Sequence, residues 1–131
     1  MFNSAKEGNP SEGAMVEPRQ SALEEVERRI SIVVERSKDQ SIAEGLKGFS
    51  KLVALEFPDL GISYALRFED GVVKEVIKGH SEAAEIKVVV PSTTFIGIID
   101  KTTSPVKEYQ LGRLRVKGPI SDLLKLRKLL F

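Results

Sequence analysis

The carboxyl-terminal segment constrains this chain more than any other part of it. Residues 119–131 read PISDLLKLRKLLF. On a helix, with about 100° between successive residues, the apolar side chains of this segment cover an arc of roughly 220°. The arc comprises Ile120, Leu123, Leu124, Leu126, Leu129, Leu130 and Phe131. So wide an apolar face must contact two apolar partners: one is the protein's own sheet, and the other is a second chain, a membrane or a bound apolar ligand.

A chain of 131 residues is long enough for one domain with one core. Residues 1–18 combine glycines and prolines with small polar residues, which predicts a flexible amino-terminal arm, and residues 19–131 are predicted to form the domain. No apolar stretch approaches the roughly twenty residues needed to cross a bilayer, so no stable membrane insertion is expected. The absence of cysteine is most simply explained by a reducing, cytoplasmic location.

Hydrophobic periodicity predicts the elements of the amino-terminal half. An amphipathic helix is expected over 21–37, with Ser21 and Glu24 as a capping box, and a short helix or turn over 41–49. Alternating apolar residues predict three strands over 51–57, 62–68 and 72–77, the last two joined by a turn at Asp70 and Gly71. These strands form an antiparallel meander.

The second half repeats strand and helix signals. A strand over 85–90 stops at Pro91, where Ser92 is predicted to cap a helix that continues to Asp100. A helical turn over 106–111, a strand over 113–117 and the closing helix over 119–131 follow. The order αβββ followed by βαβα predicts an α+β fold: one five-stranded, mostly antiparallel sheet with helices packed on one face.

Charge and composition exclude several kinds of function. The net charge is +1, and basic residues alternate with acidic ones along the chain, so no nucleic-acid surface is expected. His80 is the single histidine and lies in a predicted loop, so neither a metal site nor a catalytic base is expected there. No cofactor motif is present. Asp100 and Tyr109 are a faintly suitable acid and base pair for a small isomerase-like enzyme, and the chain is expected not to be an enzyme.

Four segments carry a family resemblance. They are DGVVKEVIKG, EIKVVVPSTTFIGIID, TTSPVKEYQLGRLRVKG and ISDLLKLRKLLF, in this order from residue 70 onward. Together they resemble the sterol carrier protein 2 (SCP2) family of small lipid-binding domains. The resemblance implies a five-stranded sheet with helices on one face. It also implies a hydrophobic tunnel for a fatty acid, an acyl-CoA, a sterol-like molecule or an isoprenoid lipid. One departure is Leu111, since many members have a polar residue immediately before the glycine at this point.

The predicted tunnel residues are apolar side chains from the helix after Pro91, the helical turn that follows it, and the closing helix. They are Phe95, Ile96, Ile99, Val106, Tyr109, Leu111, Leu123, Leu126, Leu130 and Phe131. Arg127 falls within the apolar arc of the closing helix, so its guanidinium must either extend to water or meet an anion, such as the head group of a ligand.

These patterns leave two main hypotheses. The first is a non-enzymatic carrier that encloses an apolar small molecule or lipid between sheet and helices. The second is a protein-protein interaction module whose Leu-rich closing helix docks another subunit without any ligand. We expect a monomer or a weak homodimer.

Overall fold

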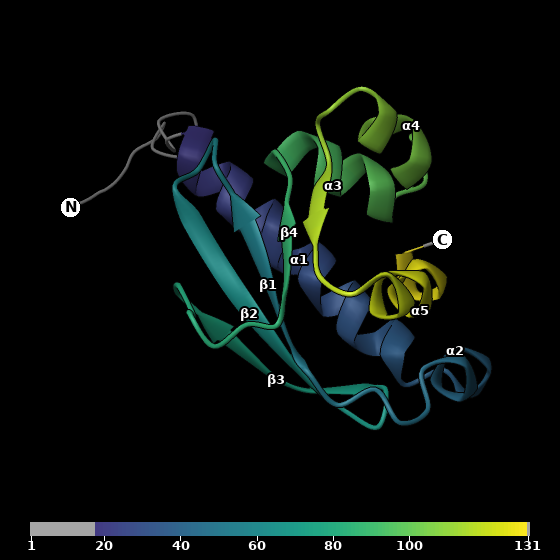
Figure 1. Cartoon of the computed structure of the whole chain (residues 1–131). Helices are drawn as coiled ribbons and strands as arrows, with labels where there is room; N and C mark the ends of the chain where they lie inside the picture. Colours follow the sequence, from purple (N-terminus) through teal and green to yellow (C-terminus); the bar gives the residue numbers. More distant parts are fainter. Residues whose placement is uncertain (1–17, 131) are drawn as a thin grey trace.

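The computed structural model describes residues 18–130, except for the side chains of Lys128 and Leu130 (Figure 1). Its elements, in chain order, are α1 (Pro18–Ser37), α2 (Gln40–Gly45), β1 (Leu52–Phe57), β2 (Ile62–Glu69), β3 (Val72–Lys78), β4 (Ile86–Val89), α3 (Ser92–Ile99), α4 (Pro105–Gln110), β5 (Arg115–Lys117) and α5 (Ile120–Leu130). The predicted order of helices and strands is confirmed. The predicted arm over residues 1–18 lies almost wholly outside the described residues.

The five strands form one sheet in the order β3-β2-β1-β4-β5. Neighbouring strands are antiparallel except β1 and β4, which run parallel. The parallel pair arises because the chain leaves β1 through the β2–β3 hairpin and returns on the other side of β1. The α+β fold with a mostly antiparallel sheet is therefore confirmed, and the sheet is mixed.

One face of the sheet carries the core. Helices α1, α3 and α5 cover this face, and α1 contacts α3, α5 and β3 (Figure 1). The helix-facing side chains of β1 and β2 include Val53, Leu55, Leu66 and Phe68, all buried. Because side chains alternate along a strand, the residues between them reach the other face.

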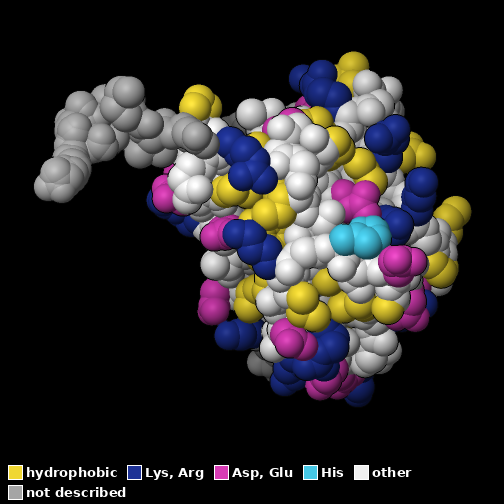
Figure 2. Space-filling view, turned by 90° about the vertical axis from the view of Figure 1, so that its left-hand side faces the viewer, with side chains coloured by type: hydrophobic (Ala, Val, Ile, Leu, Met, Phe, Trp, Pro, Cys, Tyr) yellow, Lys and Arg dark blue, Asp and Glu magenta, His cyan; other side chains and the backbone are white. Residues whose placement is uncertain are grey.

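The opposite face of the sheet is polar. Arg67 pairs with Glu75, and Lys87 lies 3.9 Å from Glu56 across the parallel strands. On the face that Figure 2 presents, basic and acidic side chains are intermixed among hydrophobic ones. Exposed ion pairs of this kind add little stability, but their charges make this face of the sheet compatible with contact with water, while the other face is packed on the core.

Two predicted helix caps are wrong. Helix α1 begins at Pro18, so Ser21 lies inside its first turn rather than at its cap; proline suits the first turn because that position needs no backbone N–H. Helix α3 is capped by Pro91 without a side-chain bond. The Ser92 amide and hydroxyl instead donate to the Asp59 carboxylate at 2.9 and 2.5 Å, which ties the start of α3 to the β1–β2 turn.

Phe57 is the centre of an aromatic cluster in the core. Its ring makes edge-to-face contacts with Tyr64 and Phe95, with centroids 6.1 and 5.2 Å apart. We predict that Phe57→Ala lowers the free energy of unfolding by about 3–5 kcal/mol, because a buried ring is replaced by a cavity. The control Val76→Ala, at a partly exposed position, should lower it by less than about 1 kcal/mol in the same urea titration. Equal losses in the two variants would contradict the packing described here.

Candidate functional site

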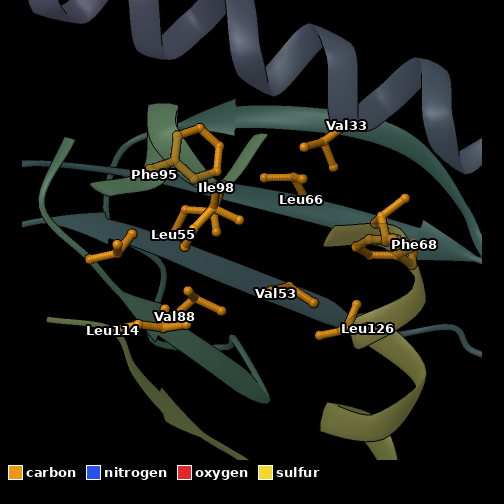
Figure 3. A pocket seen from close by; sticks show the side chains of 12 residues that line it. Val33, Val53, Leu55, Leu66, Phe68, Val88, Phe95, Ile98, Leu114 and Leu126 are labelled. Atoms are coloured by element: carbon orange, nitrogen blue, oxygen red, sulfur yellow. The ribbon is translucent and has the colours of Figure 1, made fainter. Parts of the chain in front are cut away.

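A small cavity lies between the sheet and the helices. Its volume is about 40 Å³, and every side chain around it is apolar (Figure 3). The lining residues are Val33, Val53, Leu55, Leu66, Phe68, Val88, Val90, Phe95, Ile98, Leu114, Leu126 and Leu129. The cavity is large enough for one water molecule but offers it no polar partner, so it is expected to be dry.

A larger groove opens beside this cavity, between α4, β5 and α5. Its volume is about 360 Å³. It is lined by Val88, Pro105, Val106, Tyr109, Leu114, Val116, Ile120, Leu123, Leu124, Leu126 and Arg127. Ligand pockets in proteins commonly have volumes of about 300–1,000 Å³ and mostly apolar walls, and this groove falls in that range.

Three side chains are shared by the groove and the cavity. Val88, Leu114 and Leu126 line both spaces and are buried. We call them the partition. They come from β4, from the residue before β5, and from α5, so each of the three segments contributes one side chain. Because the partition consists of side chains, rotamer changes can open a connection between the two spaces without breaking a backbone hydrogen bond.

The groove and the cavity divide the predicted site residues between them. Phe95 and Leu126 line the cavity. Val106, Tyr109 and Leu123 line the groove together with Leu126, and Arg127 lies in the same groove. The structure thus brings together side chains from the helical turn and the closing helix.

The remaining predicted tunnel residues lie elsewhere. Ile99 is buried in the core and Ile96 packs against it, but neither lines the groove or the cavity. Leu111 is exposed and lines neither space. The side chain of Leu130 and all of Phe131 lie outside the described residues.

Helix α5 presents two different apolar faces. Leu126 and Leu129 are buried against the core, whereas Ile120 and Leu124 are largely exposed and face the groove. The wide apolar arc therefore faces two regions, the core and the open groove, and the structure shows an apolar partner only on the core side. Ile120 and Leu124 lie on that arc but were not among the predicted tunnel residues, and neither were Val88, Leu114 and Val116.

Glu108 holds one wall of the groove in place. This side chain is only 3% exposed, and its carboxylate accepts hydrogen bonds from the Thr103 hydroxyl at 2.6 Å and from the Arg113 guanidinium at 2.6 and 3.1 Å. Its backbone oxygen accepts from the amides of Arg113 and Leu114. These bonds connect α4 to the chain entering β5. The hydrogen bonds from Arg113 and then from Thr103 lower the pKa of Glu108 to about 2.

A second ion pair anchors the start of α5. Asp122, in the first turn of the helix, is buried and pairs with Lys51 just before β1. The hydrogen bond to Asp122 raises the pKa of Lys51 above its usual value. The amino-terminal turn of α5 is thus tied to the sheet, while its exposed leucines border the groove.

The two residues of the candidate enzyme pair, Asp100 and Tyr109, lie in different environments. Asp100 accepts hydrogen bonds from the Arg29 guanidinium at 2.7 and 3.1 Å, and these bonds lower the pKa of its carboxyl. It lines neither the groove nor the cavity, whereas Tyr109 lines the groove. Within residues 18–130, no three acidic or histidine side chains converge as metal ligands would. Over the same described range, no helix has the length and hydropathy to cross a membrane.

Comparison with protein families decides the relationship. The model of the SCP-2 sterol transfer family matches residues 31–131, which include the whole sheet, the groove and the cavity. The chain belongs to the SCP-2 sterol transfer family. Membership in this family, together with the fold, supports lipid binding or transfer as the general function. A search of curated proteins found no significant match to the sequence.

Solved structures share the SCP2 fold at low sequence identity. Palmitated SCP2L2 from Aedes aegypti matches with a TM-score of 0.60 and 14% identity, over 78% of this chain and 90% of that one. A structure described as the UbiJ-SCP2 ubiquinone synthesis protein matches with a TM-score of 0.58 and 16% identity, over 84% and 95% of the two chains. At such identities the likeness concerns the fold.

The same fold also occurs inside a larger enzyme. A stereoselective inverting sec-alkylsulfatase from Pseudomonas sp. matches with a TM-score of 0.57 and 20% identity over 67% of this chain. The match spans only 14% of the sulfatase chain. The likeness to the enzyme therefore covers a small part of its length.

Glu108 generates a prediction about acid stability. Its pKa falls from 4.5 to about 2 in the folded protein, so the ionised carboxylate favours folding above about pH 4.5, and this contribution is lost as the pH falls toward 2. We predict that Glu108→Gln unfolds more readily at neutral pH and loses less stability than wild type between pH 7 and pH 3. Urea unfolding at both pH values measures this. Glu44→Gln, at an exposed position, should match wild type; an unchanged pH dependence in Glu108→Gln would contradict the prediction.

Proposed function

We propose that this protein is a non-enzymatic carrier that binds the hydrocarbon part of a lipid in the groove between α4, β5 and α5. The observation that carries the proposal is the partition, because Val88, Leu114 and Leu126 line both an open apolar groove and an apolar cavity in the core. A ligand that displaces these side chains reaches the cavity. The sheet would be one wall of the resulting tunnel and α5 the other.

The sizes of the two spaces define how a ligand would fit. The cavity of about 40 Å³ is far too small for a lipid, whereas the groove of about 360 Å³ can hold most of an extended chain. The hydrocarbon chain of the lipid would therefore lie in the groove, and only its end would insert past Leu126 into the cavity. Binding free energy would come mainly from desolvation, at about 0.8 kcal/mol per buried methylene group, so many apolar ligands would be accepted.

Arg127 provides a charged contact within the groove. It is exposed and lines the groove beside Leu123 and Leu124. A guanidinium can form paired hydrogen bonds with a carboxylate or a phosphate, the anionic groups of fatty acids and of acyl-CoA. The Tyr109 hydroxyl is a second polar group on the opposite wall. A head group would therefore remain at the mouth of the groove, near water.

The relatives favour ligands with a single long chain. One is described as palmitated and another as a ubiquinone synthesis protein. A fatty acid, an acyl-CoA or an isoprenoid lipid suits a narrow groove better than a rigid, multi-ring sterol-like molecule does. We propose that this chain carries such lipids in the cytoplasm, without a cofactor and without catalysing a reaction on them.

The direct test is to look for bound lipid. Protein purified from cells is extracted with organic solvent, and the extract is analysed by mass spectrometry. Displacement of a fluorescent fatty acid is then measured with the recovered lipid. Absence of any co-purified lipid, combined with absence of binding of the fluorescent fatty acid at micromolar protein, would defeat the carrier hypothesis.

The exposure of Ile120 and Leu124 gives the rival hypothesis, a protein-protein interaction module, a specific basis. Sedimentation distinguishes the two. A dimer or complex that Leu124→Glu abolishes, in a protein that binds no fluorescent fatty acid, would favour the rival. Leu126 is unsuitable for this test because it is buried, so a charge there would disrupt the core.

A tryptophan placed in the groove should compete with the ligand. Leu123 is half-buried and lines the groove but not the cavity. We predict that Leu123→Trp weakens binding of the fluorescent fatty acid about tenfold, because the larger side chain displaces roughly two methylene groups of the ligand. The matched control is Leu111→Trp, at an exposed position outside both spaces, which should bind like wild type. Equal affinities for Leu123→Trp and wild type would place the ligand elsewhere.

Arg127 should discriminate between head groups. We predict that wild type binds a fatty acid more tightly than the fatty alcohol of the same length, and that Arg127→Gln reduces this preference by about fivefold, the value of an exposed ion pair. Competition against the fluorescent probe at neutral pH measures both ligands. Arg115→Gln, at an exposed position on β5 that does not line the groove, is the control. A preference that survives Arg127→Gln unchanged would exclude this contact.

A further inference from the structure

Charge is unevenly divided between the two parts of the chain. Residues 101–131 contain eight Lys and Arg residues and two acidic residues, a net charge of +6, whereas residues 1–100 contain twelve and seventeen, a net charge of −5. The alternation of basic and acidic residues noted for the whole chain therefore fails in its last quarter. This basic quarter is the part that forms α4, β5 and α5 around the groove.

The two acidic residues of this part do not offset its charge at the surface. Glu108 and Asp122 are both buried, and each is paired with a basic residue, Arg113 and Lys51 respectively. In the described part of 101–131, no acidic side chain is exposed. Lys107 on α4 and Arg127 on α5 are exposed, and Arg115 and Lys117 are exposed on the edge strand β5, where they project to the side opposite to Val116. The edge of the molecule formed by α4, the edge strand β5 and the outer side of α5 is consequently cationic.

The same surface is unusually apolar. Five large hydrophobic residues here are at least half exposed, namely Val106, Tyr109, Leu111, Ile120 and Leu124. All but Leu111 line the groove. In the rest of the described chain, the exposed large hydrophobic residues are Ile32, Val76 and Ile77, and their exposed fractions lie between 37% and 41%. Exposed aliphatic and aromatic side chains are thus concentrated around the mouth of the groove.

We propose that this surface, formed by α4, β5 and the outer side of α5, docks on lipid bilayers that contain anionic lipids. Basic side chains would lie at the level of the head groups, and the five exposed hydrophobic side chains would insert at the boundary with the acyl chains. Neither contribution suffices alone, since stable association with a membrane surface generally needs two such signals. Here both occur on one surface.

Charge decides between a bilayer and a second copy of the chain. A symmetric dimer through this surface would bring two cationic patches together, and like charges across an interface oppose association. An anionic bilayer has the complementary charge and also offers an apolar layer for Ile120 and Leu124. The bilayer is therefore the occupant that fits both properties.

Docking in this orientation gives the carrier a direct exchange route. The inference rests on the proposed function only in this respect: the mouth of the groove would face the bilayer, so that a lipid chain could pass between them without crossing water. Binding to the bilayer itself does not require a lipid in the groove. The two proposals can therefore fail separately.

The test is vesicle flotation with the full chain. We expect binding to vesicles of phosphatidylcholine and phosphatidylglycerol, at least about tenfold weaker binding to pure phosphatidylcholine, and a decrease with added salt. The double variant Lys107→Glu and Lys117→Glu should bind the anionic vesicles at least about tenfold more weakly. The matched control, Lys38→Glu and Lys74→Glu, makes the same change in net charge at exposed positions just after α1 and on β3.

A second variant tests the apolar contribution. Leu111→Asp should also bind the anionic vesicles less, although this position lines neither the groove nor the cavity. None of these changes should alter binding of the fluorescent fatty acid in solution without vesicles. That measurement separates loss of docking from loss of the carrier site.

Three results would overturn the proposal. They are equal binding to neutral and anionic vesicles, equal weakening by the two lysine double variants, and a concentration-dependent dimer in the absence of vesicles that the Lys107 and Lys117 variant changes. Fatty-acid binding that persists in any of these cases would leave the carrier function intact.

Discussion

The architecture depends on how α5 divides its apolar side chains between two environments. Leu126 and Leu129 complete the core, and this burial holds the helix on the sheet. The ion pair between Asp122 and Lys51 fixes its first turn. If all of its large side chains were buried, α5 would be an ordinary core helix. Because Ile120 and Leu124 remain outside, the helix also forms a wall of the groove.

The other wall is organised by polar interactions. Helix α4 is a short helix that buries little apolar surface, and the bonds made by Glu108 replace the packing it lacks. A carboxylate among basic neighbours is well suited to this role, because its charge is matched as soon as the chain folds back toward β5. The groove therefore has one wall fixed by hydrophobic burial and one wall fixed by charge.

The fold could be predicted from the sequence because its signals are local. Alternation in β2, the hairpin at Gly71 and the Leu-rich end each determine one element, and their order admits few arrangements of the sheet. The residues of the site were harder to predict from the sequence. Phe95 and Ile99 lie one turn apart on the same side of α3 and both are buried, yet only Phe95 reaches the cavity, so the difference depends on where along the helix the cavity lies.

Other features depended on contacts between distant segments. Ser92 was predicted as a cap, but Asp59 from another turn engages its hydroxyl, and no local pattern records that competition. Leu114 and Val88 are brought together by the pairing of β4 with β5. The sequence does carry a signal for Glu108: an acidic residue in so basic a segment indicates an ion pair with a nearby basic residue, although it does not identify which one.

In the proposed carrier, the partition would affect how ligands of different chain length are ranked. Since Val88, Leu114 and Leu126 are held by van der Waals packing alone at that point, the threshold for admitting another carbon is set by how readily three aliphatic side chains repack. Selection by length is therefore adjustable in small steps. A smaller or larger side chain at any of these positions would change the hydrocarbon chain length that the proposed carrier prefers, while the backbone hydrogen bonds of the sheet stay as they are.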